Sequence, residues 1–517
     1  MIDRIVMEQN EYWWGGTSID GVICPFDRNT VLEHDFRVAC SNQTMPLFLS
    51  SHGRVIWSEN AFRVKIENGV FEIEGNGVLL ESFGHTLRDA YVGAMRRHFP
   101  PSGKLLPEAF FKTAQYNTWM QMTYHQTQAG VLKYAHDIVN HGFAPGIFMI
   151  DEGWQIGYGA WDFDPVKFPD PKGMVEELHA LGFTVMLWVV PYVTSSGLSF
   201  IKRIFPTLNP EHYKEPFLRT EDGKVAIVEW WNGYSAILDF TKQEDCDFLD
   251  AQLQSLMKKY GVDGFKFDGG NVGSYSVDQC VNGAPDHSAT PHERNLAWNA
   301  FGMRYRFHEY KDTFKGGGKR CIQRIWDKNH AWEGNGLADL IPCAILQGLL
   351  GYPFICPDMI GGGAWTVREL GQPVDQELFV RMAQTSALFP MMQFSWAPWE
   401  AVDENHLDMI RNAAKLHIRF SDQLLALVGD CYRSGEPILR NLEYNYPGCG
   451  YEKVTDIFML GDDILVAPVQ KKGETVRRIP LPAGTWKNEN GDVIPGGRTI
   501  EVAAPLNTLP YFVKCRQ

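Results

Sequence analysis

The seven residues Gly264-Phe265-Lys266-Phe267-Asp268-Gly269-Gly270 form the stretch that decides the fold. They predict a short buried strand at 265–267 that ends in a carboxylate and then breaks at two glycines, which let a ligand approach the backbone. Lys266 precedes Asp268 by two residues, so strand alternation directs both side chains to one face. A cation and an anion on an inward face indicate either a structural ion pair or a charged catalytic centre, and this stretch alone leaves both open.

Short apolar strands alternate with amphipathic helices on both sides of this stretch, from about Phe110 onward. Repeated strand–helix units over roughly 300 residues predict a parallel sheet closed into a (β/α)8 TIM barrel. A doubly wound open sheet is the alternative, but no Gly-x-Gly-x-x-Gly follows the first strand. The expected strands are 146–151, 184–190, 265–268, 321–326, 354–358 and 391–395, and the expected helices include 173–181 and 244–260.

Antiparallel β structure is predicted on either side of the barrel. Residues 61–66 and 70–73 alternate apolar and polar side chains around an Asn-Gly turn, which predicts a hairpin. Helices are expected to stop beyond about Gly429, where strand patterns appear at 462–469 and 477–482. The predicted domains are an N-terminal β-sandwich at 1–109, the catalytic barrel at 110–428 and a small C-terminal β domain at 429–517.

The composition argues against several classes of binding partner. The net charge of -14 argues against nucleic acid and an anionic membrane surface, because both require a basic face. The N-terminal residues lack the basic and apolar segments of a signal peptide. The ten cysteines include no Cys-x-x-Cys pair, so reduced and mostly buried thiols are expected. We therefore expect a cytoplasmic location, and the composition is compatible with a homo-oligomer.

Acidic side chains end four of the expected strands. Catalytic residues of a barrel lie at the carboxyl ends of its strands, where this sequence places Asp151, Asp268, Asp327 and Asp358, with Glu152 next to the first. Six tryptophans are close in sequence to these ends, and aromatic faces with carboxylates are typical of sugar sites. Some of these residues are expected instead to pack in the core or to cap helices. A metal site is the other alternative, but histidine ligands at suitable spacing are missing, so neither metal nor cofactor is expected. The six are Trp154, Trp188, Trp230, Trp231, Trp326 and Trp332.

Two further segments carry a family resemblance that extends from about Trp13 to Phe512. Residues 456–469, Asp-Ile-Phe-Met-Leu-Gly-Asp-Asp-Ile-Leu-Val-Ala-Pro-Val, and residues 351–362, Gly-Tyr-Pro-Phe-Ile-Cys-Pro-Asp-Met-Ile-Gly-Gly, resemble segments of glycoside hydrolase family 31. The first is similar to that family's signature after the barrel, and the second to its sixth barrel strand. Most members are retaining α-glycosidases with a (β/α)8 barrel between β domains.

The resemblance implies roles for individual residues. The family's nucleophile, an aspartate that ends the fourth strand, corresponds to Asp268. Its acid/base aspartate follows the fifth strand five residues before a tryptophan, which corresponds to Asp327 and Trp332. A retaining mechanism needs two such carboxyls about 5–5.5 Å apart, one ionised and one protonated. We expect Lys266 to keep Asp268 ionised, and neighbouring tryptophans and the charge of Asp268 to raise the pKa of Asp327.

Arg324 is similar to a family arginine on the same strand, which implies contact with a substrate hydroxyl or with the nucleophile; a surface salt bridge is the alternative. The full set of residues expected to bind substrate is Asp151, Glu152, Trp154, Trp188, Lys266, Arg324, Trp326, Trp332, Asp358 and Trp396.

Two departures from the family's usual residues affect which sugar is expected as substrate. Many relatives carry a glutamate where this chain has Gly270-Asn271, and family α-glucosidases usually carry an Arg-x-His pair that is missing from 391–399. Within the family, the sequence most resembles the branch with bacterial α-galactosidases and the animal myogenesis-regulating glycosidase. This resemblance implies exo-acting hydrolysis of small α-galactosides. In that branch Asp151 would read the axial 4-hydroxyl, assisted by Glu152 or Trp154. The alternatives are an α-glucosidase, an α-xylosidase, a sulfoquinovosidase and a sugar-binding relative without catalysis.

Overall fold

The computed structural model describes residues 2–38, 40, 42–194, 217–363 and 366–515. Its chain forms two compact units. The first unit comprises residues 1–37, 43–114 and 316–517, and the second comprises residues 38–42 and 115–315.

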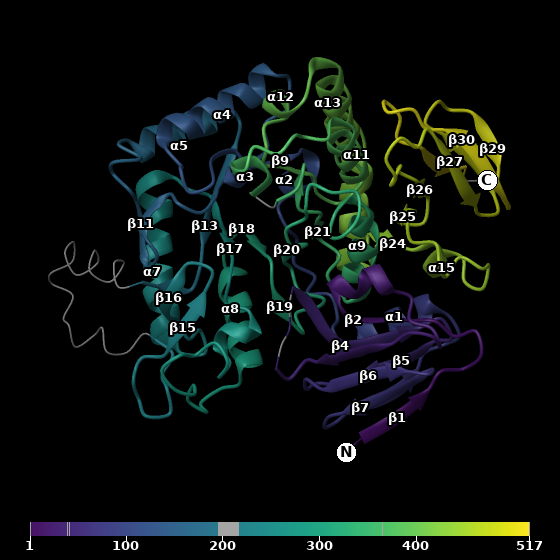
Figure 1. The fold of residues 1–517 in the computed structure, drawn as a ribbon, viewed down its shortest axis with the longest axis horizontal. Helices are drawn as coiled ribbons and strands as arrows, with labels where there is room; N and C mark the ends of the chain where they lie inside the picture. Colours follow the sequence, from purple (N-terminus) through teal and green to yellow (C-terminus); the bar gives the residue numbers. More distant parts are fainter. Residues whose placement is uncertain (1, 39, 41, 195–216, 364–365, 516–517) are drawn as a thin grey trace. The chain divides into compact units, whose positions relative to one another are not determined.

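A parallel sheet forms the centre of the second unit. Its strands pair in the order β9 (Gln115–Asn117), β10 (Ile147–Ile150), β13 (Thr184–Val189), β17 (Gly264–Phe267) and β18 (Phe307–Tyr310), and β13, β17 and β18 can be followed side by side in Figure 1. The predicted alternation of strands and helices is confirmed here. The helices between the strands are α4 (Gln128–Asn140), α5 (Pro171–Ala180), α7 (Gln243–Tyr260) and α8 (Pro291–Gly302).

Local sequence signals set the ends of these helices. The Asp170 side chain accepts from the Gly173 backbone N–H at the start of α5, and Pro171 occupies the first turn, where its missing N–H costs nothing. Helix α7 ends at Gly261, whose φ of 83° is the left-handed conformation that favours glycine. These caps explain why the helices at 173–181 and 244–260 could be predicted to within a few residues.

A three-stranded antiparallel sheet also belongs to the second unit. Strand β16 (Gly233–Ile237) lies between β14 (Tyr192–Val193) and β15 (Ile227–Trp230), and Trp231 and Asn232 form the tip of the β15–β16 hairpin. Buried rings hold the hairpin, since Tyr192 and Trp230 stack with their centroids 4.3 Å apart. The tip is therefore carried on a rigid base.

The N-terminal part of the first unit has two antiparallel sheets. The strands of one pair in the order β1 (Ile2–Val6), β7 (Val70–Glu74), β6 (Arg63–Glu67) and β3 (Leu32–Asp35), and the other contains β2 (Trp13–Thr17), β4 (Gln43–Ser50), β5 (Arg54–Trp57) and β8 (Leu79–Ser82). Phe48 of β4 and Phe71 of β7 meet edge to face at 5.4 Å, so aromatic side chains fill the space between the sheets. Asn68 and Gly69 join β6 to β7 with φ of 51° and 73°, which confirms the predicted hairpin and sandwich.

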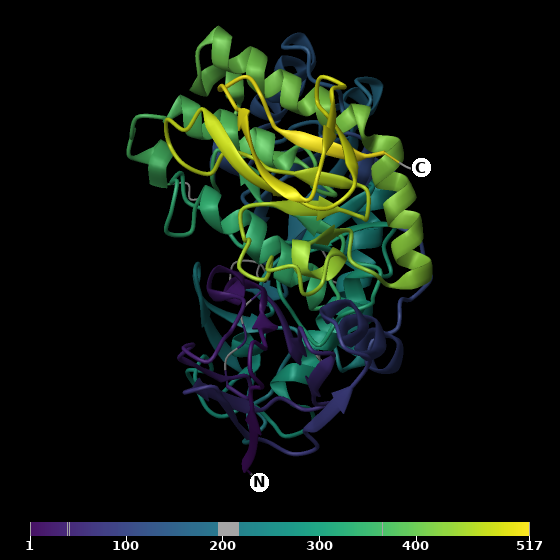
Figure 2. The same ribbon diagram turned by 90° about the vertical axis from the view of Figure 1, so that its right-hand side faces the viewer.

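The rest of the first unit contains two pairs of short parallel strands, several helices and the C-terminal β structure. The parallel pairs are β20 (Ile322–Arg324) with β21 (Ile355–Cys356), and β22 (Met359–Ile360) with β23 (Gln393–Phe394). The main helices are α9 (Leu340–Leu349), α11 (Gln376–Ser386), α13 (Glu404–Arg419) and α14 (Ser421–Ser434). The C-terminal strands, yellow in Figure 2, include β26 (Ile464–Val466), β27 (Val476–Leu481), β28 (Thr485–Asn488), β30 (Arg498–Ala503) and β31 (Tyr511–Lys514).

The expectation that helices stop near Gly429 is wrong. Helix α14 continues through Gly429 to Ser434 and ends at Gly435, whose φ of 76° provides the left-handed cap. A short helix, α15 (Leu442–Asn445), follows it. A single interior glycine lowers helix propensity without ending a helix whose apolar face is packed.

The prediction for the cysteines can be compared with the structure. All ten cysteines are free thiols and eight of them are buried, as expected. Within the described ranges, none of the helices combines the length and the apolar character that crossing a membrane requires.

Candidate active site

Asp268 lies half-buried directly after β17. Its backbone N–H donates to the Val189 carbonyl at 2.9 Å, which extends the pairing of β17 with β13. Its Oδ2 accepts from the indole Nε1 of Trp188 at 3.0 Å, and its Oδ1 accepts from the Gly269 backbone N–H at 2.9 Å. Two N–H donors fix the orientation of the carboxyl group and favour its ionised form.

The two glycines after Asp268 are required by neighbouring rings. Gly269 and Gly270 have φ of 63° and 65°. A Cβ added at Gly269 would lie 2.6 Å from the Tyr192 ring, and one at Gly270 would lie 2.6 Å from Trp298. The close approach observed is therefore that of aromatic side chains, and approach of a ligand to this backbone stays a prediction.

Lys266 is buried and forms an ion pair with Asp151, with Nζ 2.8 Å from Oδ2. Asp151 follows β10, and β13 separates β10 from β17, so the long lysine side chain reaches across one strand. We expected the charge of Lys266 to act on Asp268. The ion pair with Asp151 gives the lysine a carboxylate partner that the sequence did not predict. Support of Asp268 by Lys266 stays a prediction, as does the choice between a structural ion pair and a catalytic centre.

Both carboxylate oxygens of Asp151 accept hydrogen bonds. Oδ1 accepts from the Glu152 backbone N–H at 2.8 Å, and Oδ2 accepts from Asn117 Nδ2 at 2.6 Å in addition to Lys266. Asp151 is 3% exposed.

Glu152 is the centre of a second cluster. Its Oε1 accepts from the Tyr158 hydroxyl at 2.7 Å, from Trp231 Nε1 at 3.4 Å and from Asn232 Nδ2. Burial raises the pKa of Glu152 to about 7, and the charges of Asp151 and Asp268 act in the same direction. A carboxyl group that changes its charge near neutral pH thus lies close enough to Asp268 to respond to its charge.

The structure gives Trp154 and Trp188 supporting positions. Trp154 is fully buried and its Nε1 donates to the Trp188 carbonyl at 2.8 Å. The Trp154 ring is covered by protein in this structure, and contact of Trp154 with a sugar stays a prediction. Trp188 is 1% exposed and directs its N–H at Asp268, so it orients the carboxylate.

The first unit holds a buried arginine between two acids. Nη1 of Arg324 lies 3.0 Å from Asp327 Oδ1 and also contacts Asp358 Oδ1. The side chain of Arg324 is 2% exposed, so the alternative of a surface salt bridge is wrong. Asp327 is the open member of the group, with 43% of its side chain exposed.

Asp358 is fixed by its backbone and by its neighbours. It has a φ of 76°, and its Oδ2 accepts from the Lys328 backbone N–H at 2.7 Å. Burial raises the pKa of Asp358 to about 6, Arg324 opposes that shift and Asp327 adds to it. Because Arg324 lies between both acids, its charge is shared between Asp327 and Asp358. The charge of Arg324 opposes a raised pKa at Asp327. The raised pKa expected for the acid/base residue stays a prediction.

Trp326 holds the loop that carries Asp327. Its Nε1 donates to Asn335 Oδ1, and Asn335 Nδ2 donates to the Asp327 carbonyl at 2.9 Å. Lys328 Nζ donates to the same Asn335 oxygen at 3.0 Å and lies 4.7 Å from the centroid of the Trp326 ring. The half-buried Trp326 thus positions the acid next to it in sequence.

Trp332 and Trp396 occupy different surroundings. Trp332 is half-buried and its Nε1 donates to Asp375 Oδ2 at 3.0 Å. Trp396 is 6% exposed and packs edge to face against His330 at 6.2 Å and Phe379 at 6.4 Å. Contact of either ring with a sugar stays a prediction.

Sequence reasoning missed Asp312, which follows β18. Burial raises the pKa of Asp312 to about 8, and the charge of Asp268 contributes to the shift. Strand β18 was not recognised because Phe307-His308-Glu309-Tyr310 places two polar residues in a strand that is buried throughout. The sequence indicates this strand only by spacing, because the interval between residues 268 and 321 is longer than one strand–helix unit.

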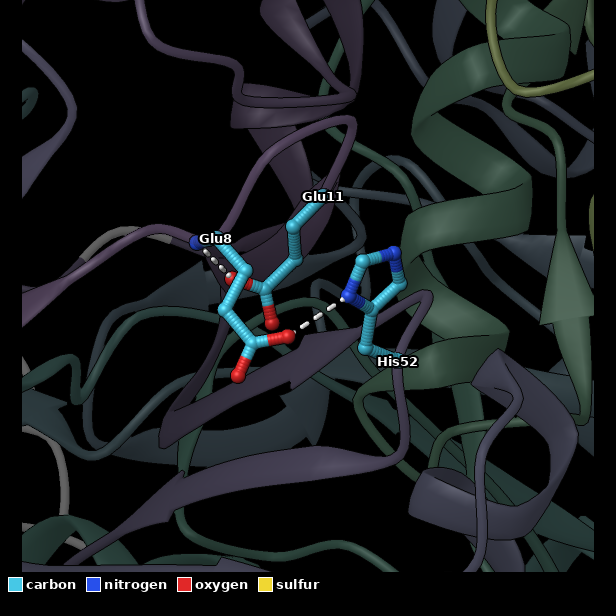
Figure 3. Close-up of side chains that lie close together, drawn as sticks. All are labelled: Glu8, Glu11 and His52. Carbon is cyan, nitrogen blue, oxygen red and sulfur yellow. Dashed lines mark hydrogen bonds and ion pairs between the residues drawn. The ribbon is translucent and has the colours of Figure 1, made fainter.

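One group of three side chains among the described residues has the spacing of metal ligands (Figure 3). Glu8, Glu11 and His52 lie together in the N-terminal part of the first unit. The Arg54 guanidinium already contacts Glu11, with Nε 2.8 Å from Oε1, and lies 3.8 Å from Glu8. The cluster is therefore an ion-pair network whose cation is an arginine.

Comparisons with known proteins bear on both units. Residues 108–427 match the model of the glycosyl hydrolases family 31 TIM-barrel domain, and residues 435–516 match the model of the glycosyl hydrolase family 31 C-terminal domain. The chain belongs to glycosyl hydrolase family 31. The (β/α)8 barrel and the small C-terminal β domain predicted from sequence are thereby confirmed.

Family 31 relatives differ in the activities that their names describe. A myogenesis-regulating glycosidase from Mus musculus is 32% identical over 427 residues, which are 81% of this chain and 58% of that protein. A sulfoquinovosidase from Agrobacterium fabrum is 26% identical over 391 residues, 70% of this chain and 56% of the relative. The chain thus spans little more than half the length of these curated relatives. Among solved structures, the family 31 dextranase of Flavobacterium johnsoniae superposes with a TM-score of 0.81 at 20% identity, over 99% of this chain and 66% of that one.

The strand count of this family 31 barrel needs one correction. Among the described residues of the barrel domain, the parallel strands begin in chain order with β9, β10, β13, β17, β18 and β20. Asp268 thus follows the fourth strand, as expected. Asp327 follows the sixth strand and not the fifth, because β18 was overlooked.

Proposed function

We propose that the protein is a retaining, exo-acting α-glycosidase that uses Asp268 as nucleophile and Asp327 as acid/base. The observation that carries the proposal is the pair of donors on Asp268. A half-exposed carboxyl group that two N–H donors orient at the end of a barrel strand has the properties that a nucleophile needs. Membership of family 31 supports the same reaction class.

In the first step, an oxygen of Asp268 forms a bond to the anomeric carbon while the bond from that carbon to the leaving-group oxygen breaks. Asp327 gives its proton to the leaving group. In the second step, Asp327 takes a proton from water, the water oxygen bonds to the anomeric carbon, and Asp268 departs as a carboxylate. Two inversions at one carbon retain the α configuration.

Arg324 fits the acid/base cycle of Asp327. Ionised Asp327 is stabilised by the guanidinium 3.0 Å away after it has given up its proton. Asp358 shares the arginine and limits that stabilisation, so Asp327 can take a proton back in the second step.

We further propose α-galactosides of small size as substrates. The absence of an Arg-x-His pair from 391–399 argues against ordinary α-glucoside binding, and the buried Asp151 carboxylate can accept from a sugar hydroxyl. The alternative substrates are those of the relatives named alpha-glucosidase 2, sulfoquinovosidase and alpha-xylosidase. A sugar-binding protein without catalysis is the last alternative.

A panel of p-nitrophenyl α-glycosides at neutral pH tests the proposal. We expect the α-galactoside to be cleaved at least about tenfold better, by kcat/KM, than the α-glucoside, a difference of about 1.4 kcal/mol in transition-state binding. Preference for the glucoside would overturn the choice of sugar and leave the reaction class standing. Failure to cleave any member would overturn the reaction class.

A further inference from the structure

Glu152 is 4% exposed, and its two carboxylate oxygens differ in their hydrogen bonds. Three donors meet at Oε1, from Tyr158, Trp231 and Asn232. Oε2 accepts no hydrogen bond from any residue in the part of the chain that the structure describes. The side chain is therefore fixed through one oxygen and free to bind a ligand through the other.

The tip of the β15–β16 hairpin provides this arrangement. Asn232 Nδ2 donates to Glu152 and also to the Tyr158 hydroxyl at 2.9 Å, so one amide links the two side chains. The residues involved are about 80 positions apart in sequence, and the stacked Tyr192 and Trp230 hold the base of the hairpin. A carboxyl group held in this way is oriented before any ligand arrives, which limits the entropy lost on binding.

Asp151 is less suited to read a hydroxyl. Its two oxygens accept from Lys266, Asn117 and the Glu152 backbone, and its charge is balanced by Lys266. Glu152 has no ammonium or guanidinium partner among its contacts with the described residues. A sugar hydroxyl would thus gain more from Oε2 of Glu152, which accepts no hydrogen bond from the described residues, than from the occupied carboxylate of Asp151.

We propose that Glu152, oriented by Tyr158 and Asn232, binds a hydroxyl of the glycone and determines which sugar is accepted. This inference rests on the proposed α-glycosidase function and names a specificity residue for it. Tyr158 and Asn232 are positioning residues. The substrate class is a neutral sugar, because an anionic glycone such as a sulfonated one would meet the like charges of Glu152 and Asp268.

The charge of Glu152 predicts a pH dependence that tests its role independently of the hydrogen bonds. Its pKa of about 7 is raised by burial and by Asp151 and Asp268, whereas Tyr158 and Trp231 oppose the shift. Tyr124 also acts on this cluster, and its pKa is raised by burial and by Glu152. Since Oε1 already accepts three donors, the proton of the neutral form resides on Oε2. A charged acceptor binds a hydroxyl more strongly than a neutral group, so discrimination should increase as pH rises through about 7.

Monodeoxy analogues of p-nitrophenyl α-galactoside test the proposal in the full-length protein. For wild type, we expect removal of one particular hydroxyl to lower kcat/KM at least about tenfold. In Glu152→Ala the same analogue should lose less than about threefold, because the contact is already absent. Asn232→Ala should reduce the discrimination as well, since Glu152 is then held by fewer donors. Glu443→Gln is the control: burial raises the pKa of Glu443 to about 7 too, but it lies in α15, and its discrimination should equal that of wild type.

The ratio of kcat/KM for the parent and the deoxy substrate should be followed from pH 5 to pH 8. Titration of Asp268 and Asp327 acts on both substrates and cancels in this ratio. We expect the ratio to rise through about pH 7 in wild type and to be flat in Glu152→Gln, which keeps the shape of the side chain. An unchanged deoxy penalty in Glu152→Ala, or an equal pH dependence in Glu152→Gln, would overturn the role of Glu152.

Failure of the proposed function gives a different result. If wild type hydrolyses none of the aryl α-glycosides, the reaction class is wrong. The same comparison is then made by calorimetric binding of methyl α-galactoside and its deoxy analogues. Weaker binding by Glu152→Ala, limited to the sugar that carries the contacted hydroxyl, would still support the inference, and equal binding by both proteins would overturn it.

Discussion

Asp268 and Asp327 have opposite surroundings, and that contrast is the basis of their assigned roles. Asp268 receives two N–H donors, from the Trp188 indole and from the Gly269 backbone. Asp327 is 43% exposed and shares Arg324 with the buried Asp358. Donors that fix a carboxylate suit a nucleophile, whereas an open side chain beside a shared cation suits a group that gives up and regains a proton.

Replacing Asp327 with alanine should therefore affect substrates according to their leaving groups. Glycosides with poor leaving groups should lose at least about a hundredfold in kcat/KM, because they depend on proton donation, whereas an activated aryl glycoside or fluoride should lose far less. Added azide should partly restore turnover of an activated substrate by attacking the glycosyl-enzyme. Equal loss on all leaving groups would place the acid elsewhere, with Asp358 as the next candidate.

At the scale of elements, the sequence predicts those strands that are short apolar runs and those helices whose ends carry capping residues. Strands β10 and β13 are predictable because each is a short apolar run, and β17 because two phenylalanines flank Lys266 before an acid and two glycines. Strand β18 was missed because its buried His308 and Glu309 break that pattern. The contact between Asn232 and Glu152 could not be predicted, because it joins a hairpin tip to a strand end far away in sequence and depends on the fold.

One element-level contact has a measurable consequence for stability. Arg381 of α11 is buried, and its guanidinium donates to the carbonyls of Glu474, Pro505, Thr508 and, at 2.9 Å, Ala504 in loops of the C-terminal β structure. Arg381→Met should lower the free energy of unfolding by about 2–4 kcal/mol, because several charged hydrogen bonds are lost together.

Urea unfolding followed by tryptophan fluorescence measures this change. Arg433→Met is the matched control, since Arg433 is 73% exposed and forms a surface ion pair with Asp430. The control should change stability by less than about 1 kcal/mol. Equal midpoints for Arg381→Met and wild type would show that Arg381 does not hold these loops.

At the scale of the whole molecule, several buried acids respond to pH in the same direction. Burial raises the pKa of Asp358 to about 6, of Glu152 and Glu443 to about 7, and of Asp245 and Asp312 to about 8. The folded protein therefore keeps protons that the unfolded chain has already released. The free energy of unfolding falls with rising pH wherever the folded state binds more protons, so stability from these groups is lost between about pH 4 and pH 8.

We expect wild type to be more stable at pH 5 than at pH 8 in urea unfolding at constant ionic strength. Asp245→Asn should reduce that difference by at least about 1.4 kcal/mol, which corresponds to one unit of pKa. The amide can still accept from the Asp239 backbone N–H that now contacts Asp245. Asp222→Asn is the control, because the pKa of Asp222 is lowered to about 2 and its charge is constant over this range. Stability that is constant or rises from pH 5 to pH 8 would contradict the expectation.

The retaining mechanism with Asp268 as nucleophile is the central claim, and covalent trapping tests it most directly. A 5-fluoro-α-galactosyl fluoride should form a glycosyl-enzyme faster than water can hydrolyse it, and intact mass should then show one added sugar. Peptide mass spectrometry should place that sugar on Asp268, and Asp268→Asn should take up none while it keeps the wild-type fold. A sugar found on another residue, or more than about a tenth of wild-type turnover in Asp268→Asn, would contradict the claim.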